Sequence, residues 1–207
     1  HRHEQELMTK DATIREIHHR VKNNLQTVSA LLRLQSRRSD EDAVKVALAE
    51  AERRVQAIAT VHAALSQNVD ESVDFDEVAR TIVRMAGAIA STDHAVEVIT
   101  TGTFGTISAD QAQALATVLN ELVANSVEHG LADRDGRIEV CAQRDNLSMK
   151  VTVADDGVGF VPGTPMSGLG TQIVHQMVRG ELRGSIEWAP REGGGTLVTL
   201  LINLDPA

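Results

Sequence analysis

The sequence predicts an α + (α+β) fold, in which an antiparallel helical hairpin precedes an α/β sandwich. Three observations predict it. Between Glu4 and Gln67 the chain has neither Pro nor Gly, which favours long helices. After Ser72 the sequence alternates helix-like and strand-like stretches, with turn residues between them. The charge divides at the same place, because residues 1–68 carry 11 basic and 9 acidic side chains whereas residues 69–207 carry 9 and 20. We therefore expect two units, 1–68 and 69–207.

Apolar residues, together with one histidine, recur at steps of three and four through two stretches of the first unit. In the first stretch they are Ile14, Ile17, Val21, Leu25, Val28 and Leu32, and in the second they are Val44, Leu48, Ala51, Val55, Ile58, His62 and Leu65. This spacing is typical of a helical hairpin or coiled coil. Ser39 or Asp40 can cap the second helix. A lone hairpin leaves apolar surface exposed, so we expect a homodimer whose hairpins form a four-helix bundle.

The second unit contains the patterns of three helices and five strands. Helices are predicted over residues 74–90, 109–129 and 169–179, and strands over residues 96–101, 138–144, 149–154, 185–189 and 196–203. We expect the helices to cover one face of a mixed sheet. Trp188 and Cys141 are expected to be core residues of their strands.

The composition excludes several classes of protein. Hydrophobic residues make up 42% and charged residues 24%, which is ordinary for a globular chain, and no stretch approaches the roughly 20 apolar residues of a membrane span. A net charge of −9 with no Tyr, one Trp and three Phe argues against a nucleic-acid partner. The lone Cys141 excludes an internal disulfide framework and a CxxC metal site. Because the chain begins at His1, we expect it to be a fragment of a longer protein.

Two adjacent histidines fall on different faces of the first helix. At about 100° per residue, His18 lies roughly 60° from Val21, the centre of the apolar stripe, and His19 lies about 160° away on the polar face. We therefore interpret His18 as a helix-packing residue. An exposed imidazole among cationic side chains can attack a phosphoryl group. From spacing alone, however, an inert surface histidine is the stronger interpretation of His19.

The residues around these histidines resemble a known motif. Residues 16–26 read EIHHRVKNNLQ, which is similar to the phosphoacceptor box of sensor histidine kinases of the HHRVKNN subclass, relatives of the HWE kinases. The resemblance implies that His19, directly before Arg20, is phosphorylated, and that Asn23 positions water for phosphatase chemistry. Commoner histidine kinases carry an acidic residue, the base, directly after the histidine. Here that residue is Arg20, so the identity of the base stays open.

Glu121 and Asn125 lie four residues apart and so share one face of the predicted helix 109–129. Apolar side chains surround them in the sequence, which favours a cleft at the edge of the core over two polar residues that simply face solvent. A carboxylate and an amide oxygen in a cleft can hold Mg²⁺ and orient a nucleophile. The spacing alone allows either interpretation.

Two glycine clusters follow along the chain. Residues 155–159 read DDGVG directly after a predicted strand, where a carboxylate can accept a hydrogen bond and glycines let the backbone approach a flat ligand. Residues 167–170 read SGLG at the start of a helix, whose free N–H groups and positive end form an anion site. Alone, the first cluster could be a tight turn and the second is a weak signal. Neither is a Walker A loop.

The order of these elements resembles the ATP-binding (Bergerat or GHKL) fold shared by histidine kinases, gyrase, Hsp90 and MutL. Four elements follow one another along the chain: a helix with the Glu/Asn pair, a DxGxG turn, a helix that starts at GLG, and a GGGT run that enters the last strand. The resemblance implies ATP and Mg²⁺ as ligands. For the base, it implies that Asp155 recognises the adenine amino group, that Gly157 and Gly159 line the pocket, and that Thr196 supports the adenine. For the phosphates, it implies a cap formed by Gly168, Leu169 and Gly170. It also implies that Asn125 binds Mg²⁺ and that Glu121 joins the metal or activates the attacking group.

The predicted lid between the two glycine clusters, residues 160–167, has no Lys or Arg. We therefore expect backbone N–H groups, Mg²⁺ and His129 or Arg134 to meet the phosphate charge. We also expect nucleotide affinity that is weak or depends on the helical unit.

Together the resemblances imply a sensor histidine kinase core, in which ATP phosphorylates His19 and a response-regulator receiver takes the phosphate onto an Asp. Residues 67–72 are the expected hinge. One alternative is an adaptor with a decayed ATP unit, but Glu121, Asn125 and Asp155 are intact. Another is an ATPase or serine kinase of the same nucleotide fold, which lacks such a hairpin. Similarity to soluble actinobacterial kinases of the subclass implies a cytoplasmic protein, with no direct membrane contact.

Overall fold

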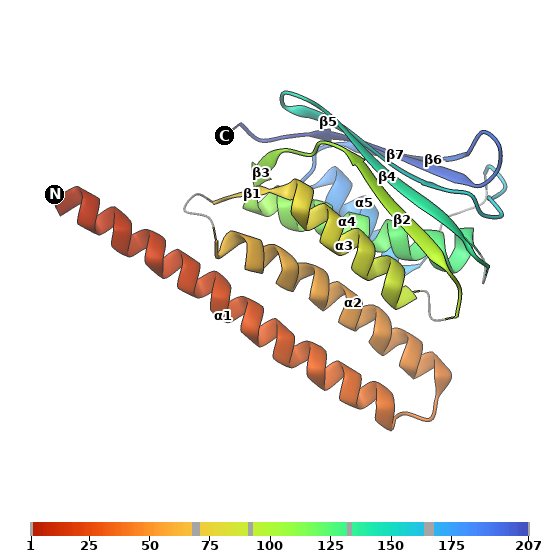
Figure 1. Cartoon of the computed structure of the whole chain (residues 1–207), viewed down its shortest axis with the longest axis horizontal. Helices are drawn as coiled ribbons and strands as arrows, with labels where there is room; N and C mark the ends of the chain where they lie inside the picture. Colours follow the sequence, from red (N-terminus) through yellow and green to blue (C-terminus); the bar gives the residue numbers. More distant parts are fainter. Residues whose placement is uncertain (1, 68–70, 91–92, 132–133, 164–167, 207) are drawn as a thin grey trace.

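The computed structural model describes residues 2–67, 71–90, 93–131, 134–163 and 168–206. Two long antiparallel helices, α1 (Arg2–Arg38) and α2 (Asp42–Leu65), form the hairpin, and α2 lies between α1 and the rest of the molecule (Figure 1). Three helices of the second unit, α3 (Phe75–Ala90), α4 (Ala109–Asn125) and α5 (Leu169–Arg179), cover one face of a sheet. The predicted helical hairpin and α/β sandwich are confirmed.

The sheet has five strands in the order β2-β4-β5-β7-β6. They are β2 (Val96–Gly102), β4 (Gly136–Asp145), β5 (Ser148–Asp155), β7 (Thr196–Asn203) and β6 (Ser185–Pro190). The strands β2 and β4 pair in parallel and the other described neighbours pair antiparallel, so the sheet is mixed as predicted. A small second sheet pairs β1 (Ser72–Asp74) with β3 (Thr106–Ser108). Neither strand was predicted from the sequence, because three residues are too few to show an alternation.

The core lies between the sheet and the helices. Along β5 the side chains of Met149, Val151 and Val153 are buried, and Asp155 continues this inward-facing series at the end of the strand. The helices contribute Leu115 and Leu119 among others. The same alternation that builds the core therefore brings one carboxylate to its edge.

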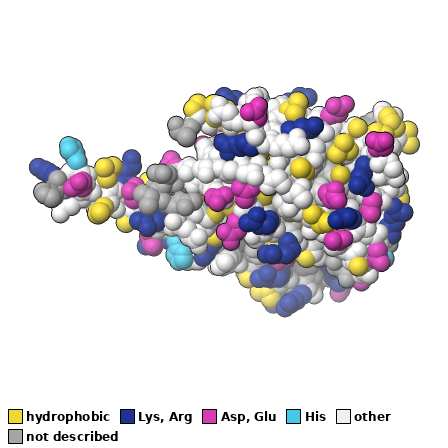
Figure 2. Space-filling view, turned by 45° about the horizontal axis from the view of Figure 1, so that its top comes forward, with side chains coloured by type: hydrophobic (Ala, Val, Ile, Leu, Met, Phe, Trp, Pro, Cys, Tyr) yellow, Lys and Arg dark blue, Asp and Glu magenta, His cyan; other side chains and the backbone are white. Residues whose placement is uncertain are grey.

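The hairpin is held partly by polar contacts. His18 Nδ1 lies 2.9 Å from His62 Nδ1, which confirms the prediction that His18 packs between the helices. Ile17 and Val28, which we expected in the seam, are 53% and 42% exposed. At its N-terminal end α1 projects beyond the rest of the molecule (Figure 2). Among the described residues, no helix is long and apolar enough to cross a membrane.

Two helix ends differ from the sequence-based expectation. Helix α2 begins at Asp42 with Glu41 at the N-cap position, and Glu41 makes no side-chain capping bond. Ser39, one of the two residues we expected to cap α2, instead accepts a hydrogen bond from the Glu41 N–H in a local turn. Helix α4, predicted to run to 129, ends at Asn125 and continues as a π-helical turn, Ser126–Gly130. This wider turn brings Gly130 against the loop after β5, where its carbonyl accepts from Val158 N–H at 2.7 Å.

Candidate nucleotide site and phosphoacceptor helix

A cavity of about 240 Å³ opens where the end of α4 and the π-helical turn meet the sheet. Apolar and polar side chains converge on it from several separate segments of the chain. The described lining residues are Leu122, Asn125, Ser126, His129, Gly130, Asp155, Gly159, Phe160, Thr171, Trp188, Thr196 and Val198. Mostly apolar walls with a few polar groups are typical of a small-molecule site.

Asp155 is the buried carboxylate of this cavity. It is 2% exposed, and its Oδ1 accepts hydrogen bonds from the backbone N–H groups of Gly157 at 3.0 Å and Thr196 at 3.3 Å. Burial raises the pKa of Asp155, although these two bonds and a third from Ser126 act in the opposite direction. The carboxylate is thus oriented by backbone donors and can accept a hydrogen bond from a ligand amino group.

Two glycines are required by the close approach of the backbone around Asp155. A Cβ atom at Gly157 would lie 1.8 Å from the carbonyl oxygen of Gly130, and one at Gly195 would lie 1.9 Å from that of Asp155. Gly195 also has a φ of +99°. Gly159 lines the cavity, as expected, whereas Gly157 is not among its described lining residues. The structure thus places Gly157 in the packing behind Asp155.

The phosphate end predicted from the GLG cluster lies at the start of α5. Gly168 stands at the N-cap position with a φ of +118°, and Leu169 is 60% exposed. Thr171, one turn into the helix, reaches the cavity wall. The first N–H groups of α5 have no partner within the helix and can bind an anion. Of the predicted lid, residues 164–167 lie outside the described residues, and Phe160 lines the cavity.

Asn125 and Glu121, which we predicted as a pair, end in different places. Asn125 lines the cavity, together with His129. Glu121 is 1% exposed, and both of its carboxylate oxygens accept from Arg54 of α2, Oε1 from Nε at 2.6 Å and Oε2 from Nη2 at 3.3 Å. This bond and the charge of Glu121 raise the pKa of Arg54, although partial burial lowers it. Glu121 is therefore engaged with the hairpin.

The donor set that faces the cavity suits Mg²⁺ only in part. Among the described residues, no group of three His, Cys, Asp or Glu side chains could hold a metal ion. Mg²⁺ is commonly held by one or two protein oxygens together with substrate phosphates and water. The side-chain oxygen of Asn125 fits this role. Glu121 would fit it only after releasing Arg54.

Some of the other cationic side chains near the cavity already have hydrogen-bond partners within the protein. Arg134, which we considered for the phosphates, donates from Nη2 to the carbonyl oxygen of Asp156 at 2.7 Å. His129 is exposed at the cavity. Burial raises the pKa of the neighbouring Glu128, although the charge of Arg53 acts against this shift. Of these candidates, His129 is the one that faces the cavity.

His19 lies on α1, exposed on the face opposite to the helix seam, and Asn23 is exposed one turn further on. Since α2 separates α1 from α4 (Figure 1), the structure does not bring His19 and the cavity together. His18 is paired with His62, whose pKa is lowered by burial and by the charge of His18. His19 is therefore the histidine of the two whose ring is free to receive a group from solvent.

The positions of three residues of this region were not predicted from the sequence. Trp188, expected in the core, lines the cavity, and its ring lies 5.3 Å from that of His175. Arg53 and Arg54 contact α4 across the interface, with Arg53 Nη1 donating to the Asn120 carbonyl oxygen at 3.1 Å. Arg53 and Arg54 lie between Ala51 and Val55, two members of the unbroken apolar series of α2, so the series gave no signal for the arginines.

Both the hairpin and the second unit match families of known proteins. Residues 16–89 match the family model described as "Histidine kinase", and residues 110–206 match that of the "Histidine kinase-, DNA gyrase B-, and HSP90-like ATPase". The chain is 44% identical over 206 residues to the sensor histidine kinase PdtaS of Mycobacterium tuberculosis and to that of Mycolicibacterium smegmatis. Each match covers 97% of this chain and 41% of the relative, so the chain spans less than half of the length of these proteins.

A solved structure supports the same fold. The histidine kinase domain of the Erythrobacter litoralis EL346 blue-light activated histidine kinase superposes with a TM-score of 0.66 at 24% identity, covering 97% of this chain and 94% of that one. The blue-light-activated histidine kinase 2 of the same species is 28% identical over 206 residues, which is 94% of this chain and 58% of the relative. With its phosphoacceptor hairpin and its ATPase unit, the chain belongs to the sensor histidine kinase family.

Proposed function

We propose that this chain is a cytoplasmic kinase core that moves the γ-phosphoryl group of ATP to His19 and then to an Asp of a response-regulator receiver. The observation that carries the proposal is the combination of two features in one chain. One is the cavity around Asp155, and the other is an exposed His19 within the HHRVKNN run. Positioning and charge neutralisation supply most of the catalysis in phosphoryl transfer.

Within the cavity, each group has a defined task. Asp155 accepts a hydrogen bond from the adenine amino group, and Thr196 supports Asp155 through its backbone N–H. The N–H groups at the start of α5 and the His129 side chain meet the phosphates. The side-chain oxygen of Asn125 would hold Mg²⁺, which would supply positive charge to the phosphoryl group that is transferred.

The hairpin supplies the acceptor and the dimer interface. A neutral imidazole nitrogen of His19 attacks the phosphorus, and Lys22 and Arg15 lie on α1 within one turn of it. The exposed side chains of Ile17, Val28, Leu31 and Leu34 support pairing with a second copy into a four-helix bundle. Asn23 is placed to orient a water molecule in the reverse, phosphatase reaction.

Transfer requires a change in arrangement, because α2 stands between α1 and α4, the helix whose end lines the cavity. The unit boundary that we propose, between residues 68 and 69, lies in the segment 67–72. Only Gln67, Glu71 and Ser72 of that segment are described. A hinge there would allow the nucleotide unit to reach a His19, on its own chain or on the partner.

Labelled ATP tests the proposal. The wild type and the control His3→Gln, which alters another exposed histidine of α1, should acquire acid-labile, base-stable phosphate. His19→Gln should acquire none while still binding ATP. Labelling of His19→Gln at the wild-type level would overturn the assignment.

A further inference from the structure

The contact between α2 and α4 is built on a buried ion pair. Arg54 is 20% exposed and Glu121 1% exposed, and the guanidinium meets both carboxylate oxygens. Arg53 adds a second charge, with its Nη1 at 3.7 Å from Glu121 Oε1. A forked Arg–carboxylate pair in this environment is a strong and specific contact, and removing one partner leaves an uncompensated buried charge.

The rest of this contact resembles a separable interface more than a permanent core. Asn120 is 2% exposed, and its Nδ2 has no hydrogen-bond partner among the described residues. A buried amide without a partner is costly, and it regains water when the surfaces part. The Asn120 amide therefore favours separation, and the Arg54–Glu121 pair opposes it.

Glu121 also lies directly beside the predicted phosphate site. A Cβ atom at Gly170, in the first turn of α5, would lie 2.6 Å from Glu121 Oε2 and 3.8 Å from Arg54 Nη2. Asn125, one turn along α4, lines the nucleotide cavity. A cation bound by Asn125 and the nucleotide phosphates would attract the Glu121 carboxylate away from Arg54.

We propose that Arg54 is a latch: its ion pair with Glu121 docks the nucleotide unit on the hairpin and withholds Glu121 from the cavity. This inference rests on the proposed function. Latch closure and Mg²⁺–ATP binding exclude one another, because both require the same carboxylate. Because the two events are thermodynamically linked, a change in the hairpin that weakens the Arg54–Glu121 pair should raise ATP affinity. ATP binding should in turn weaken the pair by the same coupling free energy.

The latch is tested by nucleotide binding, followed through the fluorescence of Trp188, which is the single Trp and lines the cavity. All variants carry His19→Gln, so that failure of phosphorylation does not affect the readout. Arg54→Met should bind Mg²⁺–ATP ~10-fold more tightly, a typical coupling between sites. The matched control Arg33→Met breaks the Arg33–Glu52 pair within the hairpin, 3.0 Å long, and should leave the affinity unchanged.

Arg54→Lys keeps a positive charge beside Glu121 but loses the fork, so it should give an intermediate affinity even if Arg54→Met folds poorly. Unchanged or weaker Mg²⁺–ATP binding by the folded Arg54 variants would overturn the latch. An equal gain in Arg33→Met would overturn it as well, because the effect would then come from general loosening of the hairpin.

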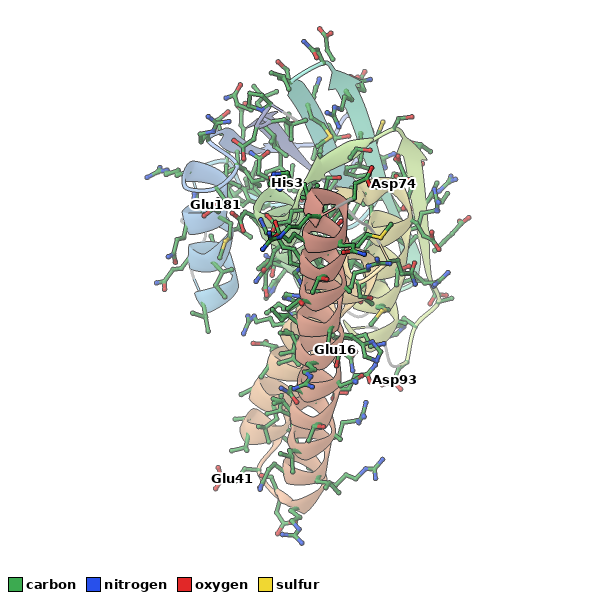
Figure 3. All side chains as sticks on the ribbon, turned by 90° about the vertical axis from the view of Figure 1, so that its left-hand side faces the viewer. His3, Glu16, Glu41, Asp74, Asp93 and Glu181 are labelled. Carbon is green, nitrogen blue, oxygen red and sulfur yellow. The ribbon has the colours of Figure 1, made fainter. Side chains whose placement is uncertain are left out.

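A separate observation concerns the base for His19. Glu16 is the one acidic residue of the hairpin at the level of His19. After Ala12, α1 has no other Asp or Glu, and α2 has none between Glu52 and its end at Leu65. Glu16 lies on α1 three residues before His19 (labelled in Figure 3), and its Oε1 accepts from Arg20 Nε at 3.0 Å. Side chains on a helix lean towards its N-terminus, so the ring of His19 covers the turn that holds Glu16.

The geometry points to Glu16 as the group that orients and deprotonates His19, with Arg20 fixing the carboxylate through one oxygen. The other oxygen accepts the hydrogen on one ring nitrogen, which leaves the second nitrogen free to attack. The N–P bond forms as the bond from the γ-phosphorus to the ADP oxygen breaks, ADP leaves with that electron pair, and Glu16 takes the ring proton.

Glu16→Gln should lower the autophosphorylation rate at least ~100-fold with the KM for ATP unchanged, the usual magnitude for a lost general base. Glu16→Asp should restore part of the rate. The control Glu6→Gln removes an equally exposed carboxylate that pairs with Arg2 on the same helix, and should behave as the wild type. A wild-type rate in Glu16→Gln, or an equal loss in Glu6→Gln, would overturn the role.

Discussion

Asp155 and Glu121 are both almost fully buried, yet they are held in opposite ways. Asp155 is oriented by backbone N–H groups and opens onto the nucleotide cavity. Glu121 is neutralised by a side chain of another helix, 67 residues away in the sequence. Backbone donors fix a carboxylate permanently, whereas an arginine on a separable surface can be withdrawn. Asp155 is thus always available to bind a ligand, whereas Glu121 becomes available for catalysis when Arg54 releases it.

The largest effect is expected for Glu121→Gln. Without the Glu121 carboxylate beside the predicted phosphate site, the autophosphorylation rate should fall ~100-fold or more. ATP affinity should stay close to that of the wild type, because the amide ends the ion pair with Arg54 but also removes the negative charge that a bound cation attracts. Radiolabel incorporation and Trp188 fluorescence measure the two properties separately. Glu50→Gln serves as the control, since Glu50 also pairs with Arg54, at 3.9 Å, but from the same helix α2. Weaker ATP binding in Glu121→Gln would place Glu121 with Asp155.

Asp155→Asn should give the next largest effect, and on binding. The amide is a weaker acceptor than a carboxylate for the adenine amino group, so ATP affinity should fall about 10- to 100-fold, the value of a hydrogen bond to a charged group. Titration calorimetry measures it directly. If ATP binds Asp155→Asn as well as the wild type, the cavity does not recognise adenine through this residue.

The smallest effect concerns stability. Burial raises the pKa of Asp155 above that of the unfolded chain, so the ionised carboxylate opposes folding at neutral pH. Asp155→Asn should therefore raise the melting temperature at pH 7 by roughly 2–4 °C. The gain should shrink as the pH falls through the raised pKa, because the wild-type carboxyl then becomes neutral as well. A gain that is independent of pH would contradict this cause.

The features that were predictable from the sequence are local ones. Helix α5 spans Leu169–Arg179 as predicted, since its glycine start and its period of apolar residues lie within one short stretch. The packing role of His18 follows from its angle to Val21 on the same helix. In both cases the information lies within one or two turns of the chain.

The features that escaped prediction depend on distant parts of the chain. The Arg54–Glu121 pair and the placement of Trp188 at the cavity require the tertiary arrangement. The π-helical turn at Ser126–Gly130 is set by its contact with the loop after β5, which propensity alone does not report. Expecting Glu121 beside Asn125 in one cleft followed from helical spacing, but spacing does not include the arginine that arrives from α2.

Whether the cavity and His19 are two parts of one reaction is decided by locating the phosphate after incubation with Mg²⁺–ATP. Mass spectrometry under conditions that preserve phosphohistidine should find it on the peptide that contains His19 in the wild type. Asp155→Asn should carry much less of it after the same time at ATP concentrations that just saturate the wild type. Phosphate on another residue, or on His19 at the wild-type level in Asp155→Asn, would contradict the assignment of this chain as a histidine kinase core that uses this cavity.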